Sequence, residues 1–114
     1  MAFLYIIDHG GIPSAADYEY KALDGKCRQV ANVATISGFK NIRGNEDDLK
    51  SAIANVGPIV AGIHASGPFY QYSEGILYDP DYTSGLNHVI LIVGYGSDGP
   101  GQDFYWIKNS WGKY

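Results

Sequence analysis

Two segments of the chain carry apolar residues at helical spacing. The first is 1–9, and the two glycines that follow it end the helix, because glycine accepts the left-handed conformation found after many helices. The second begins at Asn45, a favourable N-cap, and has three acidic residues in its first turn before an apolar stripe. The stripe consists of Leu49, Ala52, Ile53 and Val56. We expect a helix at each place, the second ended by the Gly-Pro pair after the stripe.

The rest of the chain alternates between short strand-like runs and turn-rich loops. Segments 30–39 and 59–65 contain β-branched residues and are predicted as strands. Segments 89–93 and 104–107 are more strongly apolar, and the glycine-rich turn between them predicts an antiparallel hairpin. We expect 66–85, which contains several aromatic residues, to be a long loop. The pattern therefore predicts an α+β fold.

Composition fits one globular domain. The 114 residues are 46% hydrophobic and 18% charged with a formal net charge of −4, so a core can form and the acidic balance disfavours a nucleic-acid partner. No apolar run approaches the roughly 18 residues that span a bilayer. No basic segment follows Met1. We expect no nucleic acid, no membrane span, no signal segment, no metal and no cofactor.

A glycine-rich motif follows the strand predicted at 89–93. Residues 94–99 read Gly-Tyr-Gly-Ser-Asp-Gly and match the dinucleotide-binding pattern G-x-G-x-x-G. That pattern needs a helix to begin at the loop so that its amides meet the pyrophosphate, whereas Pro100 and Gly101 lead into another strand. We interpret the motif as a hairpin loop whose glycines take positive φ angles. Dinucleotide binding is the weaker hypothesis.

His88 and Asn109 stand at the two ends of the predicted hairpin. Opposed residues of an antiparallel pair keep a constant sum of residue numbers, so pairing Tyr95 with Gln102 also places His88 opposite Asn109, with Cβ atoms about 5 Å apart. An asparagine carbonyl can accept a hydrogen bond from one imidazole nitrogen, which orients the ring and leaves the other nitrogen for chemistry. The alternative is that both are polar strand ends without a chemical role.

The sequence around this pair resembles a known enzyme family. Residues 87–96 (Asn-His-Val-Ile-Leu-Ile-Val-Gly-Tyr-Gly) and 105–112 (Tyr-Trp-Ile-Lys-Asn-Ser-Trp-Gly) are similar to the histidine and asparagine blocks of papain-like cysteine peptidases, the cathepsin L type in particular. Further matches follow in order at 1–12, 18–22, 56–59 and 75–78. The resemblance implies that 1–114 is a partial peptidase domain of papain-like α+β fold. Within it, 1–29 would supply a left-lobe helix and crossing segment, and 30–114 most of the right-lobe antiparallel β-barrel.

The resemblance assigns chemical roles to three residues. His88 would be the catalytic base and acid, Asn109 its orienter, and Trp111 the indole that shields their contact from water. In that family a thiolate paired with an imidazolium attacks the peptide carbonyl, and the imidazolium then protonates the leaving amine. The chain would therefore supply the His/Asn half of an endopeptidase active site.

The resemblance also assigns substrate-binding positions. Gly62 and Leu86 match residues that line the pocket for the second residue before the scissile bond. The small Gly62 and the apolar Leu86 imply a preference for bulky hydrophobic side chains. Asn87 stands where relatives often carry Asp, so a polar group is kept and a charge is removed.

The family's nucleophile is not found in this sequence. Its catalytic Cys lies near the mature N-terminus, with the His roughly 130 to 150 residues downstream, which from His88 places it before Met1. The one cysteine present, Cys27, matches instead a structural half-cystine bridged to the left lobe, and Tyr82 stands where many relatives carry another half-cystine. The Gln of the oxyanion hole is also absent. We expect both ends to be cut and the chain alone to be inactive.

The resemblance implies a set of partners and a setting. A peptide or protein would be the substrate, and an N-terminal lobe carrying the Cys would complete the site. A propeptide or a cystatin-like inhibitor is a further candidate, and the setting would be lysosomal or extracellular. The alternative function is a non-catalytic protease homologue that binds peptides or a protease partner.

Overall fold

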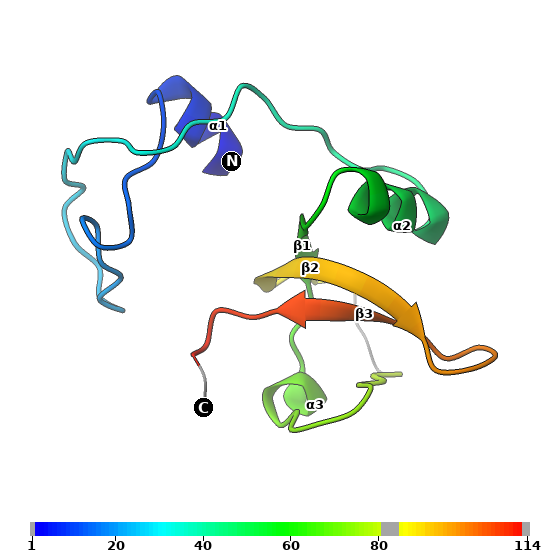
Figure 1. Ribbon diagram of the computed structural model, residues 1–114. Coiled ribbons are helices and arrows are strands. Elements are labelled where there is room, and N and C mark those ends of the chain that lie inside the picture. Colours follow the sequence, from blue (N-terminus) through cyan, green and yellow to red (C-terminus); the bar gives the residue numbers. More distant parts are fainter. Residues whose placement is uncertain (1, 81–84, 113–114) are drawn as a thin grey trace. The chain divides into compact units, whose positions relative to one another are not determined.

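The computed structural model describes residues 2–80 and 85–112. The chain divides into two compact units, Met1–Asn41 and Ile42–Tyr114. The elements are α1 (Ala2–Asp8), α2 (Glu46–Asn55), β1 (Ile59–Ile63), α3 (Gly67–Tyr70), β2 (His88–Ser97) and β3 (Asp103–Lys108), as Figure 1 shows. Helices combined with an antiparallel sheet confirm the predicted α+β class. None of the helices in the described ranges is long and apolar enough to cross a membrane.

The first unit contains α1 and an irregular segment. As predicted, α1 ends at a glycine pair, whose φ angles are 68° at Gly10 and 140° at Gly11. A Cβ on Gly11 would meet the carbonyl oxygen of Ala34 at 2.5 Å, so glycine is also required by the close approach of the backbone. This contact ties the end of α1 to the irregular segment of the same unit.

The strand predicted at 30–39 is wrong. The segment forms one isolated antiparallel bridge, in which Ile12 pairs with Ala34. On the other side of Ile12 lie α1 and its glycine pair, whose positive φ angles are not those of a strand, so the bridge does not extend into a ladder there. The β-branched residues of this segment favour an extended chain, but without a partner strand they form no sheet.

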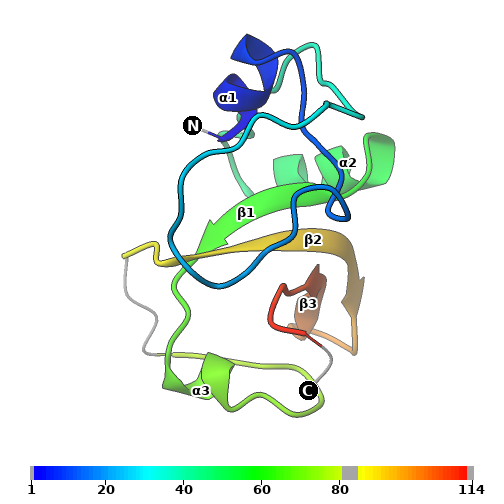
Figure 2. The same ribbon diagram turned by 90° about the vertical axis from the view of Figure 1, so that its left-hand side faces the viewer.

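The second unit is built on a three-stranded antiparallel sheet with α2 packed on one face. Its strand order is β1-β2-β3, so β2 is central (Figure 2). Alternate residues of β2 point to the same face, and Ile90 and Ile92 on that face are 4% and 6% exposed. They pack with Ile53 of α2 to form the core. His88, two residues before Ile90, lies on this same face of the sheet.

The amino end of α2 is fixed by a capping box. The side chain of Asn45 accepts a hydrogen bond from the Asp48 N–H at 3.0 Å, and the Asp48 carboxylate accepts one from the Asn45 N–H at 3.4 Å. These bonds satisfy backbone donors that have no partner inside the helix. The helix predicted after Asn45 is therefore confirmed, and Val56 caps its other end.

The hairpin is confirmed, but its predicted register is wrong. Tyr95 pairs with Tyr105 rather than with Gln102, and the strands extend to the pair Ser97 and Asp103. A tight loop closes them, in which the Asp98 N–H donates to the Gln102 carbonyl at 3.1 Å. A bulge between Ile92 and Gly94 then shifts the register by one residue. The strands are longer and the loop shorter than the glycine pattern indicated.

The glycines of the G-x-G-x-x-G motif serve two purposes. Gly99 lies in the hairpin loop with φ 122°, as predicted. Gly94 and Gly96 lie within β2, where a Cβ would come within 3.0 Å of the Trp106 ring and 2.7 Å of the Phe104 ring. Positive φ is therefore the wrong explanation for these two, which leave room for cross-strand aromatic rings.

The loop predicted at 66–85 contains the short helix α3. Pro68 occupies one of its first two positions, where its fixed φ suits a helix and its missing N–H is not needed. The single-loop prediction is thus wrong at Gly67–Tyr70. Tyr82, expected from the resemblance to replace a half-cystine, lies outside the described residues.

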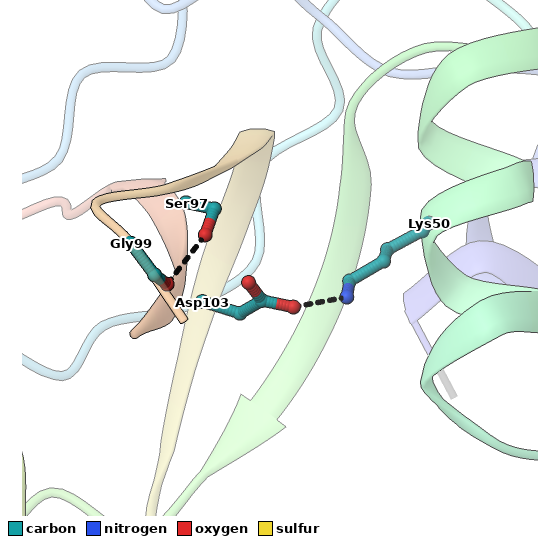
Figure 3. Close-up of polar contacts among 4 residues, drawn as sticks. All are labelled: Lys50, Ser97, Gly99 and Asp103. Carbon is teal, nitrogen blue, oxygen red and sulfur yellow. Dashed lines mark hydrogen bonds and ion pairs between the residues drawn. The ribbon is translucent and has the colours of Figure 1, made fainter. Parts of the chain in front are cut away.

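An ion pair joins α2 to the start of β3. The Lys50 Nζ donates to the Asp103 Oδ2 at 2.8 Å, next to the loop where the Ser97 hydroxyl donates to the Gly99 carbonyl at 3.0 Å (Figure 3). The hydrogen bond from Lys50 is the main cause that lowers the pKa of the Asp103 carboxyl below 3.8. The same bond raises the pKa of Lys50 above 10.5.

We expect this pair to make folding stability depend on pH in acid. A lowered carboxyl pKa contributes stability above the unfolded value, and the contribution is lost as pH falls through the folded pKa of Asp103. The pKa of Lys50 is raised, so the stabilisation by the ion pair is lost at alkaline pH only as pH rises through a value above 10.5. Thermal unfolding of Asp103→Asn between pH 2 and 7 should show a smaller acid loss than wild type. Asp98→Asn, in the hairpin loop, is the matched control, and an equal change in both variants would contradict the assignment.

Candidate active site

The structure brings the side chains of His88 and Asn109 together. The His88 Nε2 lies 2.9 Å from the Asn109 Oδ1. The same Oδ1 accepts a hydrogen bond from the Ser110 N–H at 2.8 Å, which identifies it as the carbonyl end of the amide. The Nε2 of His88 must then carry the proton and donate it, so Nδ1 is the nitrogen left to exchange protons with another group.

The contact forms although the predicted register was wrong. The ladder between β2 and β3 ends at the pair Leu91 and Lys108, so Asn109 lies just beyond it. His88 is the first residue of β2 and pairs with Ile63 of β1. Because Asn109 is outside the ladder, its side chain reaches His88 without being directly opposite it.

Two aromatic rings contact His88, and a third packs on one of them. The ring of Trp111 stacks on the imidazole at 4.8 Å between centroids and 29° between planes. Phe69 of α3 lies edge-on to both rings, at 6.1 Å from His88 and 5.5 Å from Trp111. Tyr70 stacks on Trp111 at 5.3 Å and 15°. The rings restrict solvent on one side of the His88 and Asn109 contact, although Trp111 itself remains 46% exposed.

The sequence reasoning missed Phe69 and Tyr70 because it treated their segment as a loop. The available signal was the sequence Gly67-Pro68 directly ahead of them, since proline is common at the first position of a helix. A helical turn there presents two consecutive aromatic residues at a fixed place. Their contacts with Trp111 could not be inferred from spacing along the chain.

Gly62 and Leu86 lie against each other. A Cβ on Gly62 would meet the Leu86 Cδ1 at 3.1 Å. Gly62 also pairs with Val89 of β2, and Leu86 and Val89 are 67% and 60% exposed. Because neighbours along a strand alternate, Gly62 and Val89 lie on the sheet face opposite to His88. Sequence reasoning missed Val89, which the strand register places beside this apolar patch.

A shallow groove of about 300 Å³ lies beside this patch and shares Val89 with it. Its lining residues are Val60, Val89, Ile90, Leu91, Lys108, Asn109 and Ser110. Apolar strand residues thus extend from the patch formed by Gly62, Leu86 and Val89 toward Asn109.

The side chain of Asn87 is engaged by the backbone of Ala65. Its Oδ1 accepts from the Ala65 N–H at 2.7 Å, and its Nδ2 donates to the Ala65 carbonyl at 3.1 Å. The carboxamide therefore faces the protein, and any contact it makes with a substrate would use the remaining donor or the main chain.

Cys27 belongs to the first unit and has a free thiol in this structure. It is exposed, and its Sγ lies 3.9 Å from the hydroxyl of Tyr5. This hydrogen bond is the main cause that raises the pKa of Tyr5 above 10.0. Among the residues that the structure describes, no group of three or more His, Cys, Asp and Glu side chains could hold a metal ion.

Comparison with known families decides the identity of the chain. The family described as "Papain family cysteine protease" matches residues 1–114. The chain belongs to the papain family of cysteine proteases. This confirms the resemblance carried by the histidine and asparagine blocks, and the hydrolase class that follows from it.

Relatives within the papain family include two cathepsins. Cathepsin S of Bos taurus is 50% identical over 115 residues, covering 97% of this chain and 34% of that protein. Procathepsin L of Rattus norvegicus is 46% identical over 119 residues, covering 98% of this chain and 36% of that protein. The chain therefore spans about a third of the length of the curated relatives it matches.

Solved structures of papain-family proteases share its fold. The digestive procathepsin L 3 of the Tenebrio molitor larval midgut has a TM-score of 0.89 at 43% identity, covering 97% of this chain and 37% of that one. Bromelain protease from Ananas comosus, solved with the E64 inhibitor, has a TM-score of 0.86 at 38% identity, covering 97% and 52%. The predicted papain-like fold is confirmed.

Proposed function

We propose that this chain supplies the His/Asn half of a cysteine endopeptidase active site. The observation that carries the proposal is the 2.9 Å contact between the His88 Nε2 and the Asn109 Oδ1. It holds the imidazole in one orientation and one tautomer, with Nδ1 left for a thiol. Membership of the papain family supports the same assignment.

In the proposed reaction His88 moves protons and Asn109 is a positioning residue. The Nδ1 of His88 takes the proton of a thiol, and the resulting thiolate attacks the carbonyl carbon of a peptide bond. The imidazolium returns the proton to the leaving amine as the C–N bond breaks, leaving a thioester. Water deprotonated by His88 then hydrolyses the thioester and restores the thiol.

The substrate-binding proposal rests on the exposed apolar patch. Gly62 leaves space, while Leu86 and Val89 provide apolar walls with exposed fractions of 67% and 60%. A bulky hydrophobic side chain of the substrate, two residues before the scissile bond, would bury this surface. Asn87 contributes to this region through its main chain and its remaining amide donor.

The chain by itself is expected to hydrolyse no peptide bond. Its one cysteine, Cys27, we propose to be a structural half-cystine rather than the nucleophile. A fluorogenic peptide with leucine two residues before the scissile bond should remain intact with the 114-residue chain. The same peptide should be cleaved by a longer protein that contains these 114 residues together with a thiol-bearing lobe.

The controls separate this function from its alternative. Cleavage should be stopped by iodoacetamide treatment of the longer protein, because alkylation removes the thiol that attacks the peptide carbonyl. Binding of the peptide without cleavage by the longer protein would overturn the proposal in favour of a non-catalytic homologue.

The proposed partners follow from the same function. Solved relatives include digestive procathepsins from Tenebrio molitor and a ragweed cysteine protease in its proform. These proforms support a propeptide as a partner, beside the peptide or protein substrate and the lobe carrying the thiol. A cystatin-like inhibitor is a further proposed partner, and we propose a lysosomal or extracellular setting.

A further inference from the structure

The ring of His64 is hydrogen bonded to the peptide group that precedes Leu86. Its Nδ1 lies 2.5 Å from the Gly85 carbonyl oxygen. A carbonyl oxygen can only accept a hydrogen bond, so Nδ1 carries a proton and donates it. His64 directly follows Ile63, the last residue of β1, and its ring joins the end of that strand to the segment that leads into β2. His64 lies outside the residues to which the family resemblance assigns a role.

This hydrogen bond fixes the direction in which Leu86 leaves the backbone. The carbonyl group of Gly85 and the N and Cα atoms of Leu86 lie in one peptide plane, so holding the oxygen holds the plane. Gly85 has no side chain that could pack and hold the plane instead. A Cβ built on Gly85 would lie 3.8 Å from the His64 Nδ1, so the imidazole lies directly beside this glycine.

The side chain of Leu86 is held by few contacts of its own. It is 67% exposed, and its Cδ1 lies over Gly62, where a Cβ would come within 3.1 Å. An apolar side chain that leaves so little of its surface buried gains little free energy from one fixed position. The place of Leu86 therefore depends on the backbone that carries it.

A separate set of hydrogen bonds holds the backbone between Leu86 and the imidazole. The Asn87 N–H donates to the Ile63 carbonyl at 3.0 Å, and the Asn87 carboxamide bonds to both backbone groups of Ala65. His88 is itself paired with Ile63 in the ladder. Loss of the bond from His64 should therefore release Leu86 and leave the imidazole of His88 in place.

We propose that His64 is a positioning residue that determines specificity, because its bond to the Gly85 carbonyl fixes Leu86 as a wall of the substrate patch. A wall that is fixed before binding favours a branched apolar side chain that packs against it, such as leucine. A methyl group, as in alanine, hardly reaches the wall and gains little from it. This inference rests on the proposed function, since it concerns the same substrate-binding patch.

The test compares three variants of His64 in the longer protein. His64→Ala removes the donor. His64→Asn should restore it, because the amide nitrogen of asparagine and the Nδ1 of histidine are both bonded to Cγ. His64→Gln carries the same amide one carbon further from the backbone. His9→Ala is the matched control, because the His9 Nδ1 also lies 3.0 Å from a backbone carbonyl, that of Tyr5 in the first unit.

The readouts are kcat and KM for two fluorogenic peptides, which carry leucine or alanine two residues before the scissile bond. In His64→Ala the KM of the leucine peptide should rise about three- to tenfold, because binding must then order a mobile wall. The KM of the alanine peptide should change less than about twofold, because a methyl group buries little of the wall. The kcat of both peptides should stay close to wild type, since His88 keeps its position.

The asparagine variant separates the hydrogen bond from the bulk of the ring. His64→Asn should return the KM of the leucine peptide to within about twofold of wild type, because the same donor is replaced. His64→Gln should remain close to His64→Ala. Methyl NMR of Leu86 gives a readout that does not depend on cleavage, since its order parameter should fall in His64→Ala and recover in His64→Asn.

The outcomes distinguish this inference from the proposed function. If wild type cleaves both peptides and His64→Ala has the same ratio of leucine to alanine KM as His9→Ala, the positioning role is wrong and the proposed function stands. If wild type cleaves neither peptide, the proposed function fails. The order parameters of Leu86 and the affinities of the two peptides, measured by fluorescence anisotropy, then decide the inference alone.

Two further results would overturn the positioning role. One is an equal loss for both peptides in His64→Ala that His64→Asn does not reverse, which is the sign of general destabilisation. The other is an equal KM of the leucine peptide in His64→Asn and His64→Gln, a comparison that decides the matter even where His64→Ala does not fold.

Discussion

Replacing His88 with alanine should lower kcat/KM for peptide cleavage by about 10²- to 10⁴-fold in the thiol-bearing protein, the range that a positioned general acid and base contributes. Alanine can neither take the thiol proton nor protonate the leaving amine. KM should change little, because the proposed hydrophobic patch lies on the opposite face of the sheet. Steady-state kinetics on a fluorogenic peptide measures both parameters.

Removing the residue that orients His88 should lower activity less than removing His88 itself. Asn109→Ala should lower kcat about 10- to 100-fold, since a hydrogen bond to a charged imidazolium contributes roughly 1.5 to 3 kcal/mol. His9→Ala is the matched control, because His9 lies in the first unit with its Nδ1 3.0 Å from the Tyr5 carbonyl. A loss of activity in His9→Ala as large as in His88→Ala would contradict the assignment.

Replacing Ile90 with alanine should reduce the free energy of unfolding by about 2 to 5 kcal/mol. Ile90 is 4% exposed and packs with Ile92 and Ile53, so the truncation leaves a cavity between β2 and α2. This is a large fraction of the roughly 5 to 15 kcal/mol that stabilises a typical domain. Urea unfolding of the 114-residue chain, followed by tryptophan fluorescence, gives the value.

The neighbouring residue provides the control for this core prediction. Val89 lies on the same strand but is 60% exposed, so Val89→Ala should change the free energy of unfolding by less than about 1 kcal/mol. Ile90→Ala should also broaden the NMR signals of His88, two residues away on the same face. Equal losses in the two variants would mean that the core does not lie where α2 meets β2.

The residues within and next to α2, β2 and β3 were enough to predict these three elements from the sequence. The capping residues around Asn45 and the apolar stripe after it specify α2 without help from the rest of the protein. The apolar runs of β2 and β3 likewise specify the hairpin. The strand expected at 30–39 failed because strand formation needs a partner, and the bridge between Ile12 and Ala34 does not extend into a ladder.

The candidate site was predictable where it lies at the ends of the hairpin. His88 and Asn109 meet because one begins β2 and the other directly follows β3, so an error in register did not separate them. Trp111 was placed over the pair by the family resemblance, but Phe69 was not predictable, because it reaches the imidazole through contacts across the fold. The bonds between Asn87 and Ala65 also join segments that are 22 residues apart in the sequence.

The central claim is that His88 is the proton partner of a cysteine thiol. Its most direct test is the rate at which iodoacetamide alkylates that thiol in the longer protein, measured from pH 4 to 9 with Cys27 left in place, because a half-cystine is not alkylated and its removal would free a second thiol. A thiolate paired with the His88 imidazolium should react rapidly down to about pH 5, whereas in His88→Ala the rate should follow an ordinary thiol with a pKa of about 8.5. Identical pH profiles for the two proteins would contradict the account.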